Sequence, residues 1–470
     1  MRSPPTRLEY PTLRKARFLC PTRFKANGKD LKDQVKAISN LKIDKVTVWD
    51  NGAAFDIIPP ANSGRRFYSS WKEISQKRTP TYKSLAVVSP AMEKKVKELT
   101  VDSSTTIEVI QTLSEFAQSI NYISVALDLG KGGGYTPRPA DEVFKTKYGD
   151  CKDKTNLLHG LLKIKGIDLY PLIVYSVQTK IFEEWPSPSQ FNHCVAAIKV
   201  DDTFSSPATI QHPELGNLLI FDPTSTFTPF GDLPYSIQDS KGILLAGDKG
   251  GLVSIPRIPL EKSLLKRDIQ LELLPNGKAI GVINETSSGQ AGKRERQYAF
   301  IKDSDYMQMT KDWIASFHPG AEISEPKRDD DISSGNFSME VAFGAPSFAK
   351  NMRNVLLIFK PVALNRVTSV PFGEEDRRQA VDLYSYNLEE TTKIFLPEGF
   401  EISEMPDNVT LEEEFASYDL TFELKEDAIH VHRSIKVHPV RVELDQYEKL
   451  ENFYKRWIKA DQSSVVLERS

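Results

Sequence analysis

The sequence predicts a multidomain α+β protein in which a block of helices followed by strands lies between β-rich regions. The chain has 470 residues, which is too long for one compact core, because domains of about 100–200 residues are typical. Hydrophobic residues make up 40% and charged residues 27% of the chain, an ordinary globular balance. Helical periodicity marks the central block, while alternating apolar segments with turn signals dominate on either side of it.

The N-terminal region, residues 1–95, is predicted to be a β-rich domain. The alternation in Ile43–Trp49 predicts a strand, and the Asn51-Gly52 turn signal predicts that residues 53–58 complete a hairpin. Few full strands are visible in the first 40 residues. We therefore expect this domain to be incomplete at its N-terminal end.

The central block, residues 96–255, is predicted to hold two helices and then a run of strands. Apolar residues at three- and four-residue steps predict a helix over 105–120, and a glycine-rich loop follows at 130–139. A second helix is predicted over 151–165, with Gly166 placed to end it. Helices followed by strands favour α+β packing. The predicted strands are 169–176, 194–200 and 218–221.

The remaining chain is predicted to form a β-rich domain with one helix, residues 256–375, and a β-sandwich-like region with a terminal helix, residues 376–470. Pro275-Asn276-Gly277 between two alternating segments predicts a hairpin. Residues 329–335 are predicted to be a solvated loop. The other predicted elements are a helix over 294–317, strands over 391–396, 418–424 and 428–437, and a helix over 444–459.

Charge and hydropathy exclude several classes of partner. The net charge is −3 and the pI is about 6.2, so no electrostatic argument favours nucleic acid or an anionic membrane. No stretch approaches the roughly 20 apolar residues that span a bilayer. Residues 1–15 contain no apolar run typical of a signal peptide. Three cysteines are too few and odd in number for a disulfide framework, so at least one thiol is free.

Cys151 is the candidate nucleophile. It lies in the segment Tyr148–Lys154 (YGDCKDK), where a loop is predicted to become a helix. The first turn of a helix offers unpaired N–H groups and roughly half a positive charge, and both favour the reactive thiolate. Lys152 adds positive charge nearby and Asp150 opposes it, so the sequence leaves the sign of the local field open.

His193 and Asp222 are the candidate partners of this thiol. A thiolate nucleophile needs an imidazole as proton acceptor and donor, and the imidazole needs a group that fixes its tautomer. His193 stands at the head of one predicted strand, and Asp222 ends the next, just before Pro223. Adjacent strands of one sheet would bring the two side chains together. The three residues therefore predict a catalytic triad of thiol, imidazole and carboxylate.

The segments YGDCKDKTNLLHGLLKIKGI, FNHCVAAIKV and LLIFDPT together resemble the transglutaminase-like superfamily, whose papain-type thiol core is shared with cysteine proteinases. More narrowly, the chain resembles bacterial multidomain proteins in which such a core lies between β-rich domains of unknown function. The region around Tyr122 and Gly132–Gly134 and the stretch 395–409 share this resemblance. It implies a central transglutaminase-like core flanked by β-rich, sandwich-like domains, with Cys151, His193 and Asp222 as the catalytic residues.

The resemblance also implies an activity. Thiol-dependent acyl transfer on amide bonds would make the chain a peptidase or amidase that acts on a protein or peptide substrate, or a transglutaminase if an amine is the acceptor. No cofactor and no metal are implied. The alternative is a non-catalytic envelope scaffold with an idle triad. The bacterial multidomain proteins that the chain resembles are often exported to the periplasm or cell envelope, so the resemblance suggests such a location. The substrate and the oligomeric state are left open.

An acyl-transfer site also needs donors for an oxyanion. The backbone N–H of Cys151 is the first candidate, and the side chains of Tyr122 and Tyr135 are candidates for a second. A metal-dependent hydrolase is a weaker hypothesis, because His430 and His432 share one strand face without an evident carboxylate or thiol partner. The remaining chemistry-bearing residues are expected to serve packing. These are Cys20, His159 and Cys194.

Overall fold

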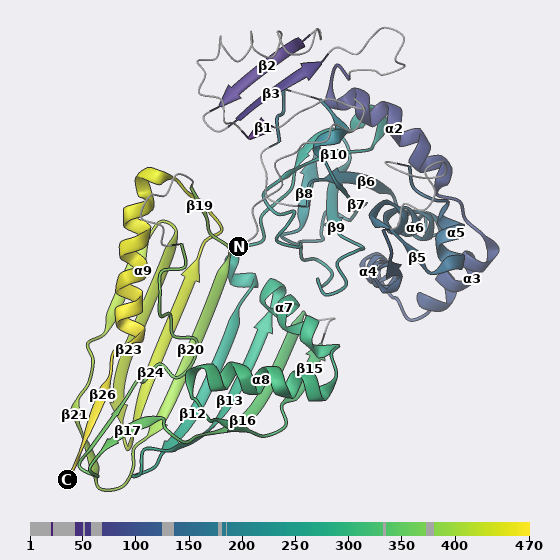
Figure 1. Cartoon of the computed structure of the whole chain (residues 1–470). Coiled ribbons are helices and arrows are strands. Elements are labelled where there is room, and N and C mark those ends of the chain that lie inside the picture. Colours follow the sequence, from purple (N-terminus) through teal and green to yellow (C-terminus); the bar gives the residue numbers. More distant parts are fainter. Residues whose placement is uncertain are drawn as a thin grey trace, which may run out of the picture.

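The computed structural model describes residues 20–21, 43–49, 52–57, 68–124, 136–176, 181–184, 186–331, 335–372 and 380–470. Near the N-terminus, β2 (Ile43–Trp49) and β3 (Gly52–Ile57) pair antiparallel, so the predicted hairpin is confirmed. A short strand, β1 (Cys20–Pro21), extends the sheet beside β3. This small sheet lies at one end of the molecule in Figure 1.

Helices rather than further strands complete the region that was predicted to be β-rich. Helix α2 (Trp71–Leu85) begins after the capping residue Ser70, and α3 (Pro90–Leu99) begins after Ser89. In each case the serine hydroxyl accepts a hydrogen bond from a backbone N–H of the first turn, which satisfies a donor that the helix itself leaves unpaired. Helix α2 packs on the sheet of the central block through Ile74 and Tyr82.

The central block combines helices with a six-stranded antiparallel sheet of order β11-β10-β6-β7-β9-β8. Helix α6 packs against β6 and β7. Figure 1 shows the helices gathered around this sheet. The helices are α4 (Thr106–Ser119), α5 (Ala140–Thr146) and α6 (Cys151–Ile164). The sheet strands are β6 (Leu169–Val174), β7 (His193–Lys199), β8 (Thr209–His212), β9 (Gly216–Phe221), β10 (Lys241–Leu244) and β11 (Gly251–Ser254), and a separate parallel pair is formed by β4 (Asn121–Tyr122) and β5 (Tyr148–Gly149).

Helix α6 is the central element of this block, and its sequence explains its limits. Asp150 accepts a hydrogen bond from the Asp153 N–H while the Asp153 carboxylate accepts one from the Asp150 N–H, which is a capping box. Apolar residues then recur along one stripe and are fully buried in the core of the block. Gly166, with φ of 70°, lies just beyond the helix, where a side chain would be strained. The buried stripe consists of Leu157, Leu158, Leu161 and Leu162.

The C-terminal half of the chain forms a nine-stranded sheet that joins the two predicted segments 256–375 and 376–470. Strand β12 of the first segment pairs in parallel with β20 of the second, and one hydrophobic cluster spans both. We therefore describe them together as the β unit, and the boundary expected near residue 375 falls inside it. The sheet strands are β12 (Leu265–Leu273), β13 (Ala279–Ser288), β14 (Glu322–Ile323), β15 (Lys327–Asp331), β16 (Asn336–Ala345), β20 (Tyr386–Phe395), β22 (Val409–Glu413), β23 (Ala416–Lys425) and β24 (Ala428–Val437).

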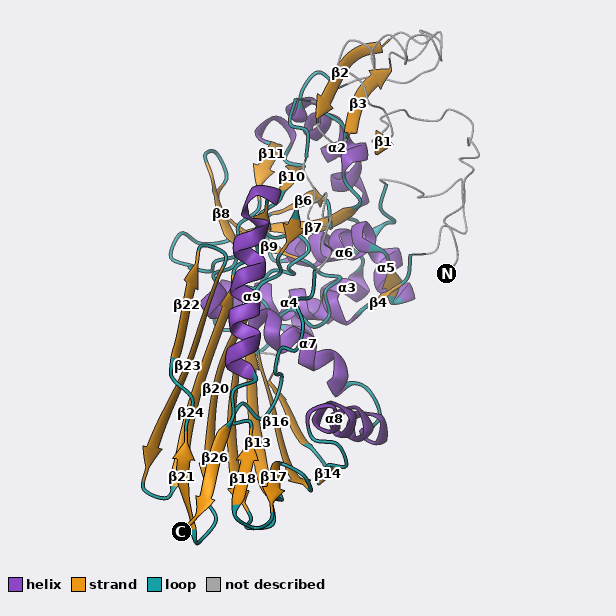
Figure 2. Cartoon of the chain, turned by 60° about the vertical axis from the view of Figure 1, so that its left-hand side comes forward, coloured by secondary structure: helices purple, strands orange, loops and turns teal. Residues whose placement is uncertain are grey.

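Burial alternates along the long strands, so one face of this sheet is covered and the other faces solvent. The covering layer contains α8, α9 and a smaller four-stranded sheet, as Figure 2 shows from the side of α9. The helices are α7 (Gly289–Ala299), α8 (Asp303–Phe317) and α9 (Tyr447–Asp461). The remaining strands are β17 (Ala349–Met352), β18 (Leu356–Phe359), β21 (Phe400–Glu404) and β26 (Val465–Arg469), together with the pair β19 (Val381–Asp382) and β25 (Arg441–Val442).

Two sequence predictions in this unit need correction. The single helix expected over 294–317 is two helices, because α7 ends at Ala299 and α8 begins anew at Asp303. The loop expected over 329–335 begins as an edge strand, since β15 pairs with β16 up to Asp331. An edge strand exposes one side to solvent and often carries charged residues there. Its polar composition therefore resembles that of a loop. The hairpin around Pro275-Asn276-Gly277 is confirmed by the pairing of β12 with β13.

None of the helices in the described ranges is both long and apolar enough to cross a bilayer.

Candidate active site

Cys151 occupies the first position of α6 and is half-buried. Its side chain packs at the border of a small apolar cluster that α2, β6, β7 and β10 build together. Phe191 and Ile173 belong to this cluster, and Trp71 lies at its border with its ring edge against Phe191. The sulfur therefore has an apolar wall on one side and the polar start of α6 on the other.

The fold brings His193 and Asp222 together. His193 is the first residue of β7, and Asp222 follows β9, the neighbouring antiparallel strand. The register pairs Ala196 with Phe221, so its continuation makes Asp222 a diagonal neighbour of His193 on the same face. The His193 Nε2 and Asp222 Oδ2 atoms are 3.0 Å apart. The hydroxyl and backbone N–H of Thr224 donate to the other Asp222 oxygen at 2.7 and 2.9 Å, which fixes the carboxylate in place.

Cys151 completes this arrangement from the side of the helix. Its thiol lies within electrostatic range of the His193 ring and contributes to the raised pKa of that ring. Because Asp222 occupies Nε2, Nδ1 is the ring nitrogen that remains for the thiol. The structure thus joins imidazole and carboxylate by a hydrogen bond and places the thiol within electrostatic range of the same ring.

Electrostatics favour a protonated His193 ring. Burial alone would lower the pKa of His193, but the charge and hydrogen bond of Asp222, with a smaller contribution from Cys151, raise the pKa to about 10. Burial would likewise raise the pKa of the Asp222 carboxyl, yet His193 and Thr224 outweigh it and hold this pKa below its usual value. The pair is therefore imidazolium and carboxylate around neutral pH.

Ion pairs at the start of α6 answer the question of local charge that the sequence leaves open. The Asp150 carboxylate pairs with Lys152, and the Asp153 carboxylate pairs with Arg138 through Nε at 3.0 Å. Arg138 also donates its backbone N–H to Asp153 at 2.8 Å. The two carboxylates that oppose a thiolate at Cys151 are therefore each matched by a cation.

Lys154 is a further cation beneath the site, and it is fully buried. Its ammonium donates to the backbone oxygens of Gln118 and Ile120, at 2.9 and 2.6 Å, at the C-terminal end of α4. Burial lowers its pKa to about 8, although Asp222 acts in the opposite direction. The sequence analysis missed this role. Helical spacing in the sequence could have predicted its burial. Lys154 precedes Leu157, Leu158 and Leu161 by three, four and seven residues and so lies on the buried stripe of the helix.

The two tyrosine candidates have different outcomes. Tyr122 in β4 pairs in register with Gly149, two residues before Cys151, and its side chain is half-exposed. Burial, then the charges of Cys151 and Asp222, raise the pKa of Tyr122, so the phenol lies within electrostatic range of the sulfur. Tyr135 lies outside the described residues.

The other cysteine and histidine residues that the sequence analysis considered lie outside the contact between His193 and Asp222. Cys194 is buried behind the site, with its sulfur 3.9 Å from the Tyr82 hydroxyl, and burial raises the pKa of this thiol far above its usual range. His159 lies further along α6, and burial lowers its pKa to about 4. His430 and His432 lie on β24 in the β unit. The two histidines of the metal-hydrolase hypothesis therefore belong to the nine-stranded sheet and not to the sheet that carries His193.

Comparisons with known proteins cover different parts of the chain. Residues 354–467 match a family described as a domain of unknown function with solved structure, DUF3858, and this segment lies within the β unit. Among solved structures, a protein described as a putative protease from Parabacteroides distasonis ATCC 8503 is similar at 14% identity and a TM-score of 0.48. That match covers 92% of this chain and 68% of the other. None of the curated proteins compared with the chain matches it.

Proposed function

We propose that the chain has a transglutaminase-like thiol core that catalyses acyl transfer from amide bonds, most simply as a peptidase or amidase. The single observation that carries the proposal is the 3.0 Å contact between His193 and Asp222, with Cys151 at the start of α6 within electrostatic range of the same ring. The ion pairs at the start of α6 support it, because they neutralise the Asp150 and Asp153 carboxylates beside the thiol.

In the proposed reaction the Cys151 sulfur attacks the carbonyl carbon of an amide, and the negative charge moves to the carbonyl oxygen. The helix start offers backbone N–H groups to this oxyanion, and Tyr122 is the proposed side-chain donor. The His193 imidazolium then gives its proton to the leaving amine, and a thioester with Cys151 forms. Asp222 keeps the ring oriented throughout.

The second half of the reaction resolves the thioester. Neutral His193 takes a proton from water, the resulting hydroxide oxygen attacks the thioester carbon, and the sulfur leaves. The products are a carboxylic acid and the starting enzyme. If a primary amine attacks instead of water, the same steps yield a new amide, which is transamidation. We propose hydrolysis as the primary activity and transamidation as the alternative outcome.

Selective alkylation tests the nucleophile. In the full chain, iodoacetamide at pH 7 is expected to modify Cys151 much faster than Cys194, which is buried and holds its proton tightly. His193→Ala is expected to slow the reaction of Cys151 by at least about tenfold, because it removes the imidazolium. Peptide mapping by mass spectrometry would report each rate, and Cys151→Ser is the control for assignment.

Turnover separates an active enzyme from an idle scaffold. Quenched fluorescent peptides report hydrolysis, and incorporation of a fluorescent primary amine into casein reports transamidation. Activity that is lost in both Cys151→Ser and His193→Ala is expected. Equal alkylation of Cys151 and Cys194, with no turnover in either assay, would contradict the proposal and favour the scaffold.

A further inference from the structure

A buried glutamine outside the proposed triad contacts the turn of residues 222–228, which begins at Asp222. Gln118 is the penultimate residue of α4, and its side chain is buried. Its amide nitrogen donates to the Ser225 oxygen at 2.9 Å and to the Thr228 oxygen at 3.0 Å. The amide of one helix residue therefore holds two backbone oxygens of a short turn that is distant in the sequence.

The same turn orients the Asp222 carboxylate. Thr224 donates its hydroxyl and backbone N–H to one carboxylate oxygen at 2.7 and 2.9 Å, while the other oxygen lies 3.0 Å from the His193 ring. The turn also closes on itself, because the Ser225 N–H donates to the Asp222 oxygen at 3.2 Å and the Thr228 N–H donates to the Ser225 oxygen at 3.0 Å. A displacement of its later residues would therefore move Thr224 and the carboxylate that Thr224 holds.

Gln118 is itself fixed to the helix that carries Cys151. The ammonium of Lys154, three residues after Cys151 on α6, donates to the backbone oxygens of Gln118 and Ile120 at 2.9 and 2.6 Å. Lys154 is fully buried, so these contacts are shielded from water. A cation at this end of α4 also satisfies carbonyl groups that the helix leaves unpaired. Gln118 therefore joins α6 to the turn of Asp222 through a single residue.

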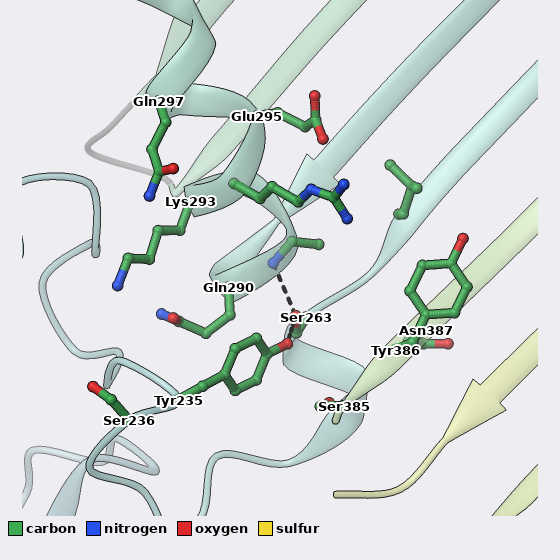
Figure 3. Close-up of a pocket in the computed structure, with 13 residues that line it drawn as sticks. Tyr235, Ser236, Ser263, Gln290, Lys293, Glu295, Gln297, Ser385, Tyr386 and Asn387 are labelled. Carbon is green, nitrogen blue, oxygen red and sulfur yellow. Dashed lines mark hydrogen bonds between the residues drawn. The ribbon is translucent and has the colours of Figure 1, made fainter. Parts of the chain in front are cut away.

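The β unit holds other parts of the same loop. Arg296 on α7 donates to the Phe227 oxygen at 3.3 Å, and the hydroxyls of Tyr235 and Ser263 lie 2.8 Å apart. Figure 3 shows Tyr235 beside Ser263 in the wall of a cavity of about 430 Å³. Gln118 belongs to the central block instead, so its contacts relate the loop to the helix of the nucleophile. Loss of the Gln118 amide should leave the loop attached to the β unit but free to shift against α6.

We propose that Gln118 is a positioning residue that holds the Asp222 carboxylate against the His193 ring. Its amide fixes the backbone of the turn, and the turn places Thr224, whose two donations orient the carboxylate. The role is indirect, since Gln118 acts through the turn and not on the reacting atoms. Its consequence for acyl transfer rests on the proposed function, whereas the contact between the carboxylate and the ring exists without turnover.

Titration of the His193 ring in the full chain tests the proposal. Gln118→Met keeps an unbranched side chain of similar length but removes both amide donors. Burial lowers the pKa of His193, but Asp222 outweighs it and raises the pKa to about 10. A displaced carboxylate should therefore lower the proton affinity of the ring at least about tenfold. NMR signals of ¹³C-labelled histidine, followed from about pH 6 to about pH 11, measure this change, and His193→Ala assigns the signal.

A second buried glutamine provides the matched control. Gln238 lies later in the chain between β9 and β10, and its amide donates to the Leu233 oxygen at 2.7 Å. Gln238→Met removes a comparable hydrogen bond without touching the turn of Asp222. The pKa of His193 should therefore stay unchanged in this variant. Melting temperatures of both variants show that each is folded.

A double variant shows whether Gln118 acts through Asp222. In the Asp222→Asn background, Gln118→Met should leave the pKa of His193 unchanged, because the carboxylate that Gln118 positions is absent. Lys154 and Lys293 also lie within electrostatic range of Asp222. Both lysines are retained in every variant, so the difference between the two backgrounds reports the carboxylate.

Gln118→Asn is a second, milder substitution, which keeps the amide but shortens its reach by one carbon, and it should lower the pKa of His193 by less than Gln118→Met does. Three results would overturn the proposal: an unchanged His193 pKa in folded Gln118→Met, an equal fall in Gln238→Met, or a fall that persists in the Asp222→Asn background. Unfolding of both Gln118 variants would also overturn it, because Gln118 would then support the fold as a whole. A parent chain without turnover would reject the proposed reaction alone, since the ring titrates in either case.

Discussion

At the scale of single residues, the site consists of charges that are matched almost one for one. Asp222 is matched by protonated His193, Asp153 by Arg138 and Asp150 by Lys152. Lys154 is the cation without a carboxylate of its own, and it is held by backbone oxygens instead. Arg138 also lies 3.6 Å from the Glu142 carboxylate, so cations and carboxylates around the start of α6 offset one another.

The titration of His193 gives a prediction about stability and pH. Its pKa rises from 6.5 to about 10 on folding, so its contribution is complete below pH 6.5 and is lost as the pH rises toward 10. We expect the free energy of unfolding to fall between pH 7 and pH 10 more steeply in the parent chain than in Asp222→Asn. Urea unfolding at a series of pH values measures this difference.

His159 provides the contrast for this titration. Burial lowers its pKa to about 4, so it is already neutral in the folded chain above that value. His159→Gln should therefore keep the alkaline decline of the parent chain. The prediction fails if Asp222→Asn and the parent chain lose stability in parallel over this range.

At the scale of elements, helix α6 and the two strands that carry His193 and Asp222 were the parts most accessible to sequence reasoning. Local signals define them: an apolar stripe, a glycine stop, and two β-rich runs. Residue type, position and the family resemblance together single out the three candidate residues, and their catalytic roles are a proposal. Arg138 was missed because its link to Asp153 joins residues 15 apart across a loop, and no periodicity records such a contact.

The larger arrangement had no comparable signal. The β unit exists because β12 pairs with β20, and Leu265 lies opposite Leu388 across more than 100 residues of chain. Alternation predicts that each strand exists and which face is buried, but it does not name the neighbour. Alternation alone therefore does not show that the segments on either side of residue 375 share one sheet.

The capping box of α6 gives an element-scale prediction, because α4 has a matched one. In α4, Glu108 completes an exposed box with Thr105. In α6, Asp153 completes the box and also holds the partly buried Arg138. We expect Glu108→Ala to lower the free energy of unfolding by about 1 kcal/mol, and Asp153→Ala by about 3 kcal/mol, because the second also removes the closer of the two carboxylate partners of partly buried Arg138.

Chemical denaturation of the two variants measures the difference, and alkylation gives a second readout. Since Asp153 fixes the first turn that carries Cys151, Asp153→Ala should also slow the reaction of Cys151 with iodoacetamide, whereas Glu108→Ala should not. Equal destabilisation by the two variants would show that the Arg138 contact contributes nothing beyond the cap.

At the scale of the whole molecule, a row of alternating charges crosses the covered face of the β unit. The strand register places Glu285, Arg267, Glu390 and Arg433 side by side on β13, β12, β20 and β24. Each neighbour is in contact, with distances of 2.8, 2.8 and 3.1 Å, and Asp461 of α9 ends the row 3.3 Å from Arg433. All of these side chains are buried, so the helix and the sheet are held by charges as well as by apolar packing.

The row predicts a large effect of losing one member. Arg433→Met would leave the carboxylates of Glu390 and Asp461 buried without that partner, and we expect a loss of about 3–5 kcal/mol in the free energy of unfolding. Arg441→Met is the matched control. It removes an exposed pair with Asp382 and should cost no more than about 1 kcal/mol. Similar losses in the two variants, measured by urea unfolding, would contradict the structural role of the row.

Contacts between the central block and the β unit form the last part of the molecule's organisation. Arg296 on α7 is fully buried and donates to the Phe227 oxygen of the Asp222 loop at 3.3 Å and to the Asn336 oxygen of β16 at 2.9 Å. It also pairs with Asp330 on β15. One guanidinium therefore ties the loop behind the triad to the edge of the large sheet.

We expect Arg296→Met to loosen this loop locally. Amide hydrogen exchange over residues 224–235 should become at least about tenfold faster, while exchange in β23 and β24, at the far side of the sheet, stays unchanged. Because the loop carries Asp222, alkylation of Cys151 should slow in the same variant. Arg441→Met again serves as the control for losing an arginine. Uniformly faster exchange would instead mean that Arg296 supports global stability, and unchanged exchange would mean that the loop is held without it.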